Sequence, residues 1–75
     1  MRLDINIDEV WTHKHKELNL SVLVIYKVEN FIHYRKLDDK FNLGRLLGWA
    51  DESFYENYIF NQKLTEEYLI KVIIE

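Results

Sequence analysis

Alternation of apolar and polar residues is the dominant pattern in the first half of the chain. Leu3, Ile5 and Ile7 are separated from one another by single polar residues, which is typical of a strand with one buried and one solvated face. Residues 12–17 are polar throughout and carry no helical apolar stripe. We therefore expect an N-terminal strand near residues 3–7, followed by a loop or an exposed strand end.

Two further runs, which together cover residues 18–37, predict a long β-hairpin. A two-residue loop between the runs would place Glu29 at positive φ, which is costly for a residue that has a Cβ. A three-residue loop that ends with Asn30 in the left-handed region avoids this cost. It also sets Val24 opposite Tyr34, whereas a shift by one residue would set a charged side chain opposite Val24. We therefore expect the three-residue loop.

The predicted hairpin has apolar residues on both of its faces. Leu23 and Ile25 lie on the face opposite to Val22 and Val24. Such a hairpin is either covered on both sides or keeps one face for a partner. A short chain has little material for two covers, so this pattern predicts association with another protein or with a second copy.

The period changes after Leu37, and the apolar spacing becomes that of helices. Asp38 suits an N-cap and Gly48 suits the residue after a helix, which predicts a short helix over residues 39–47. Asp51 suits the cap of a second helix, although the alternation of Phe54, Tyr58 and Phe60 also fits a strand.

A third helix is expected after Thr65, where two glutamates form an acidic first turn. The β-branched residues near the end of the chain also fit a strand, and we favour the helix.

Composition limits the fold and the setting. The chain has 75 residues, of which 48% are hydrophobic, with no cysteine, no proline and two glycines. These values predict one α+β domain over residues 1–75, in which an antiparallel sheet packs against two or three short C-terminal helices. The lack of cysteine excludes disulfide scaffolds and thiolate metal sites. The longest charge-free apolar run is too short to span a bilayer, and no export signal is visible. We expect a cytoplasmic protein without a membrane segment.

Codon chemistry adds a hint about the origin. Phe, Tyr, Met, Ile, Asn and Lys, whose codons are AT-rich, total 31 residues. This bias is common in viruses and mobile elements, so a viral protein that acts in the host-cell cytoplasm fits the composition.

The net charge of −3 is unevenly distributed. The first 37 residues carry six basic and five acidic side chains, whereas residues 38–75 carry four basic and eight acidic ones. The second half contains an acidic and aromatic stretch typical of protein interfaces. Together with Leu23 and Ile25, we expect its residues to contact a protein partner: Asp51, Glu52, Tyr55, Glu56 and Tyr58.

Basic residues in the first half suggest an alternative function, nucleic-acid binding. Two clusters next to aromatic residues would form one patch if the first cluster lay beside the hairpin. The candidate residues are Lys14, Lys16, Tyr34, Arg35 and Lys36. Because the whole chain is acidic, we place this alternative second.

Histidines suggest a third function. His13 and His15 would point the same way on an extended segment and are the candidate ligands of a metal ion. With His33, they are also candidates for metal-independent nuclease chemistry. The neighbouring lysines disfavour a metal, and so short a chain offers little cleft. We therefore expect no cofactor, no bound metal and no enzyme activity.

The apolar residues exceed what one small core needs. Leu23, Ile25, Tyr55 and the pair Ile73 and Ile74 have no obvious internal place. We therefore expect a small protein-binding, inhibitor or accessory protein. The excess also fits a homodimer or higher oligomer.

Overall fold

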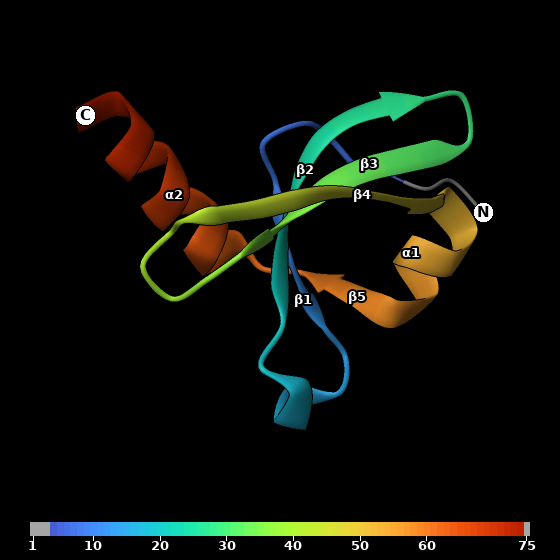
Figure 1. Ribbon diagram of the computed structural model, residues 1–75, viewed down its shortest axis with the longest axis horizontal. Helices are drawn as coiled ribbons and strands as arrows, with labels where there is room; N and C mark the ends of the chain where they lie inside the picture. The colour runs from blue at the N-terminus through green and yellow to red at the C-terminus, as the bar shows by residue number, and fades with distance from the viewer. Residues whose placement is uncertain (1–3, 75) are drawn as a thin grey trace.

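The computed structural model describes residues 4–74 as a five-stranded antiparallel sheet with two α-helices (Figure 1). The elements follow one another as β1 (Val10–His13), the short 3-10 helix η1 (Lys16–Leu18), β2 (Ser21–Val28), β3 (Phe31–Leu37), β4 (Leu43–Ala50), α1 (Asp51–Asn57), β5 (Tyr58–Phe60) and α2 (Gln62–Ile74). The spatial order of the strands is β4-β3-β2-β1-β5, so that β4 and β5 are the edges. The expected α+β domain with an antiparallel sheet and C-terminal helices is confirmed.

Each face of the sheet packs against one helix, and we name the faces after these helices. On the α1 face, Phe54 of α1 lies in a core cluster of buried residues: Ile5, Trp11, Val22, Val24, Ile32, Tyr34, Phe54 and Tyr58. On the α2 face, Leu64 and Tyr68 of α2 pack against a second cluster formed by Val10, Leu23 and Leu37. In Figure 1 the two helices lie toward opposite ends of the sheet.

The first strand begins later than predicted. Residues 1–3 lie outside the described part, and residues 4–9 form no strand. Instead, the Asn6 backbone N–H donates to the Glu9 carboxylate at 2.8 Å, and Asp8 adopts a φ of 69°. A tight turn therefore occupies the alternating segment, and β1 starts at Val10.

The hairpin of β2 and β3 has the predicted pair but not the predicted loop. Val28 pairs with Phe31, so the loop has two residues, and Glu29 adopts a φ of 53°. Val24 nevertheless pairs with Tyr34, because the register shifts by one residue between Val24 and Tyr26. This β-bulge restores the aliphatic and aromatic pairing that the loop alone would have lost.

The helix predicted over residues 39–47 is wrong. Asp38 does not cap a helix; its carboxylate accepts from the backbone N–H groups of Lys40 and Asn42 in a turn that leads into β4. The ladder between β3 and β4 is irregular between Arg35 and Leu37, which places Leu43 and Leu46 on the same face of the sheet. The bulge thus places apolar residues of one face three positions apart instead of two, and a spacing of three is typical of one face of a helix.

The two remaining helices are confirmed with different boundaries. Asp51 is the first residue of α1, and its N-cap is Ala50. The chain leaves this helix at Tyr58 to form β5. The third predicted helix, α2, starts at Gln62, because the Asn61 side-chain oxygen accepts from the Leu64 backbone N–H at 2.9 Å and caps the helix.

Candidate functional site

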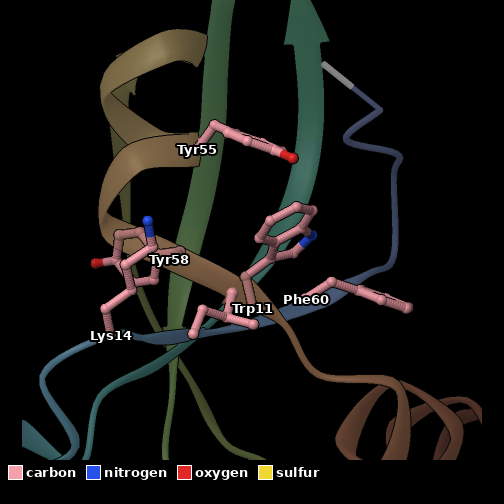
Figure 2. A pocket seen from close by; sticks show the side chains of 6 residues that line it. Trp11, Lys14, Tyr55, Tyr58 and Phe60 are labelled. Carbon is pink, nitrogen blue, oxygen red and sulfur yellow. The ribbon is translucent and has the colours of Figure 1, made fainter. Parts of the chain in front are cut away.

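An aromatic hollow of about 310 Å³ opens where β1, β5 and α1 meet. Figure 2 shows Tyr55 above Trp11, with Lys14 and Tyr58 at one end of the hollow and Phe60 at the other. We call this hollow the aromatic pocket. It is lined by Trp11, Lys14, Tyr55, Tyr58, Ile59 and Phe60.

The floor of the aromatic pocket is buried and rigid. Val10 packs in the α2-face cluster, so the next residue of β1, Trp11, faces α1 and is only 4% exposed. Its ring centroid lies 5.6 Å from that of Phe54 and 5.8 Å from that of Phe60. These contacts hold the indole in one orientation beneath the opening.

The walls of the aromatic pocket, in contrast, are exposed. Ile59 and Phe60 belong to the edge strand β5, so no further strand covers them. Tyr55 projects from α1, and its ring centroid lies 6.1 Å from that of Trp11. Exposed apolar walls above a buried aromatic floor are the features that interface anchors fill in protein complexes.

Burial keeps the pocket floor uncharged. Burial, together with the neighbouring Tyr34 to which the Tyr58 hydroxyl is hydrogen-bonded, raises the pKa of Tyr58 to about 12. Burial also raises the pKa of Tyr34. Both phenols are therefore neutral at physiological pH.

The charged side chains around the aromatic pocket come from α1 and from the loop after β1. Glu52 and Glu56 are exposed on α1, three residues before and one residue after Tyr55. The i, i+4 spacing of Glu52 and Glu56 places their carboxylates next to each other on the outer side of α1, with Glu52 one turn from Tyr55. Lys14 lines the pocket and brings the opposite charge.

Two of the predicted protein-contact residues, Tyr55 and Tyr58, line the aromatic pocket. Glu52 and Glu56 are exposed on α1, the helix that carries Tyr55. Asp51 is buried at the start of α1.

Leu23 and Ile25 are away from this site, on the α2 face. The expectation that they lack an internal place is wrong, because Leu23 is 1% exposed under α2 and Ile25 packs against the same cluster. The helix α2 covers the second face of the hairpin, although the chain was expected to be too short to cover both faces. Leu23 is therefore not available to a partner.

Sequence reasoning missed Trp11, Ile59 and Phe60. Trp11 was assigned no protein-contact role, and the short strand β5 was obscured by the helical spacing of the residues before it. The alternation of Tyr58 and Phe60 was the one signal for this strand, and the adjacent Ile59 and Phe60 were the signal for an exposed apolar edge.

The residues of the nucleic-acid alternative do not form one patch. Tyr34 is 6% exposed and cannot stack on a base. Arg35 and Lys36 are consecutive in β3 and therefore project from opposite faces, and the Arg35 Nε donates to the Gly44 carbonyl at 2.6 Å. Lys14 and Lys16 line a second hollow of about 360 Å³ next to the aromatic pocket.

The three histidines do not converge on one site, because His33 lies apart from His13 and His15. The rings of His13 and His15 stack at 5.4 Å, and the His13 Nδ1 accepts from the His15 backbone N–H at 3.0 Å. His33 belongs to the α2 face, where it contacts Tyr26, whereas His13 contacts Tyr58 of the α1-face cluster. Within residues 4–74, no three His, Asp or Glu side chains gather in a way that could hold a metal ion.

Nor does any helix within residues 4–74 have the length and apolarity required to cross a membrane. Comparison of the chain with protein-family models, with curated proteins and with solved structures finds no match.

Proposed function

We propose that this protein acts by binding another protein, and that the aromatic pocket holds an apolar or aromatic side chain of that partner. The observation that carries the proposal is the arrangement of exposed Tyr55, Ile59 and Phe60 around the buried floor of Trp11. The proposed setting is the cytoplasm, and the proposed role is that of an inhibitor or accessory protein.

The chemistry of the pocket favours an anchor side chain. Tyrosine and tryptophan are enriched among the residues that contribute most to protein interfaces, because they bury a large area with few rotatable bonds. The contacts of Trp11 with Phe54 and Phe60 order the floor before a partner arrives. An incoming side chain thus meets a preformed surface and loses less ordering entropy.

Charge at the rim favours a basic residue next to the anchor. Glu52 and Glu56 are exposed, and within residues 4–74 neither carboxylate makes a hydrogen bond or an ion pair. A lysine or arginine close to the anchor would reach them, and an arginine would also contact the Tyr55 ring. Lys14 disfavours a second cation at its end of the pocket. We therefore propose a partner segment with one apolar anchor and a basic residue on one side.

A nucleic-acid strand fits the aromatic pocket less well. The phosphate backbone calls for several cations along its path, whereas Lys14 is the one cation that lines this pocket and the helix that carries Tyr55 also exposes Glu52 and Glu56. The rings also form a recess rather than a row of flat platforms, because Trp11 meets Tyr55 and Phe60 at interplanar angles of 56°.

A displayed library of random peptides tests the proposal without knowledge of the partner. The immobilised wild-type protein should enrich peptides that carry a large apolar residue with a lysine or arginine nearby. Tyr55→Ala and Phe60→Ala each remove one wall, so we expect at least a tenfold loss of affinity for the enriched peptides, the effect of about 1.4 kcal/mol. Affinities would be measured by fluorescence anisotropy with synthetic peptides.

Two controls locate the binding. Leu18→Ala removes an exposed apolar side chain in η1, outside the pocket, and should leave affinity unchanged. Glu52→Gln with Glu56→Gln should weaken binding of basic peptides but not of neutral analogues. Enrichment of acidic peptides, no enrichment at all, or equal losses in Leu18→Ala and Tyr55→Ala would each contradict the proposal.

A further inference from the structure

The α2 face of the sheet is covered over only one half. Leu64 and Tyr68 of α2 pack over Val10, Leu23 and Leu37, and the Lys71 Nζ reaches the Lys40 carbonyl beyond them. At the other end of the same face, near the hairpin loop, no described element lies over the sheet. In Figure 1, α2 stands at the end of the sheet away from this loop.

The uncovered half carries apolar and aromatic side chains rather than polar ones. The ladder pairs Tyr26 with His33 and Val28 with Phe31, and Leu46 follows on the neighbouring strand β4. We call these residues the open patch: Tyr26, Val28, Phe31, His33 and Leu46. Its four apolar members are between 38% and 53% exposed. An antiparallel sheet whose second face meets water normally presents polar residues there.

The rings of the open patch brace one another. Tyr26 and His33 stack at 4.3 Å with an interplanar angle of 19°, and Phe31 lies 5.3 Å from His33. Gly48 permits this arrangement, because a Cβ at that position would come within 2.6 Å of the Phe31 ring. Since the ring faces of Tyr26 and His33 are turned toward each other, a nucleic-acid base gains little from stacking there. The patch is instead a firm apolar surface of the kind that meets another protein surface.

We infer that the open patch is the interface of a homodimer, in which the patches of two copies pack face to face about a twofold axis. This dimer is independent of the aromatic pocket, which lies on the α1 face. The dimer would use the same face of the hairpin on which Leu23 and Ile25 were expected to bind a partner. The contact residues would be those of the open patch, not Leu23 and Ile25.

The apolar area of the patch is a large part of what a standard dimer interface contains. An aromatic side chain has roughly 150–250 Å² to bury, so about 40% exposure leaves on the order of 60–100 Å² on each ring. Together with Val28 and Leu46, the patch thus offers on the order of 300 Å² of apolar surface. A standard interface buries about 800 Å² per partner, and a little over half of it is apolar. The open patch would therefore supply most of the apolar centre of a small interface, with the polar rim around it.

Charge on the open patch is compatible with a second copy. The patch contains no lysine, arginine, aspartate or glutamate, and Arg35 at its edge is held by the Gly44 carbonyl. A partner of strong opposite charge therefore finds no complement here. A twofold arrangement also closes on itself and leaves no second patch open for growth.

Sedimentation velocity across about 1 to 500 µM tests the inference, because dimerisation depends on protomer concentration. We expect a monomer–dimer equilibrium in the wild type. Val28→Lys and Leu46→Lys should each raise the dissociation constant at least tenfold. Leu18→Lys, at a similarly exposed position in η1, should leave it unchanged. Circular dichroism would establish that each variant is folded. If one of the two patch variants does not fold, the other is enough to test the inference.

Cross-linking locates the contact, because the chain contains no cysteine of its own. Tyr26→Cys and Leu46→Cys should each give a covalent dimer with a short bismaleimide, and Leu18→Cys should not. A strict monomer at the highest concentration would overturn the inference. So would a dimer that persists in Val28→Lys and Leu46→Lys but is lost in Ile73→Lys, because the interface would then lie on α2.

Discussion

Thr65 shows how a single side chain connects the two ends of this chain. Its hydroxyl oxygen accepts from the Val10 backbone N–H at 2.8 Å and donates to the Asn61 carbonyl at 2.8 Å. Val10 is fully buried, so no water replaces this partner. The bond therefore attaches α2 to β1 across 55 positions of sequence.

Replacement of Thr65 tests this connection. Thr65→Val keeps the shape but leaves a buried N–H without an acceptor, so the free energy of unfolding should fall by about 1–3 kcal/mol. Thr65→Ser keeps the hydroxyl and loses only a methyl group, and should cost no more than about 1 kcal/mol. Urea denaturation followed by tryptophan fluorescence measures both. Equal losses in the two variants would show that packing, not the hydrogen bond, sets the stability.

Tyr58 should make the protein sensitive to alkaline pH. Its pKa is about 12 in the folded state against 10.0 for an unperturbed tyrosine, with burial as the main cause. The folded state therefore holds the Tyr58 proton more tightly than the unfolded state. The protonated Tyr58 makes its full contribution to the free energy of unfolding below pH 10. This contribution should decline as the pH rises from about 10 to about 12.

Tyr58→Phe removes this titration. We expect the variant to lose less stability than the wild type between these pH values in denaturation experiments. An ultraviolet titration should show Tyr58 and Tyr34 ionising above pH 10. Ionisation of this pair near pH 10 without unfolding would contradict the raised pKa values of the two buried tyrosines.

At the scale of elements, the two-residue hairpin loop that accompanies the bulge in β2 holds Glu29 in a strained backbone conformation. Glu29 occupies the left-handed region at φ 53°, which costs a residue with a Cβ about 1–2 kcal/mol. Glu29→Gly should therefore raise the free energy of unfolding by about 0.5–1 kcal/mol. Asn30 is not among the described residues with positive φ, so Asn30→Gly should lower stability by a similar amount. Thermal denaturation of the two variants checks the opposite signs.

The same bulges explain which elements were predictable. The alternation in β2 and β3 is long enough to survive one irregularity, and the helices α1 and α2 have acidic or polar starts and apolar stripes. The strand β4 was read as a helix because the irregular ladder near Leu37 set Leu43 and Leu46 three residues apart on one face. A bulge depends on the partner strand, and local spacing carries no information about that partner.

The candidate site was predictable in part for the same reason. Glu52, Tyr55 and Glu56 lie within one turn of a single helix, so their nearness to one another follows from local geometry. Trp11 and Phe60 meet only because β5 returns to pair with β1. That long-range pairing also explains why Leu23, which seemed to lack a cover, lies under α2.

For the molecule as a whole, some apolar residues do remain exposed after folding, but Leu23 and Ile25 are not among them. Ile73 and Ile74, for which no internal place was expected, are 80% and 78% exposed in the second half of α2. Since folding buries little of Ile73, Ile73→Lys should change the free energy of unfolding by no more than about 0.5 kcal/mol. Chemical denaturation measures this change. A loss above about 1 kcal/mol would mean that the helix end is covered in solution.

The order of strands in the sheet also predicts the order in which the elements fold. The pairs from β1 to β4 join neighbours along the chain, whereas β5 must return to β1 from the far end of the sequence. Loop closure delays such distant contacts, so we expect the meander to form first and the segment from α1 to α2 to dock last. During synthesis that segment also emerges after the meander. The walls of the aromatic pocket belong to it, so binding competence should appear only at the final step of folding and be the first property lost on partial unfolding.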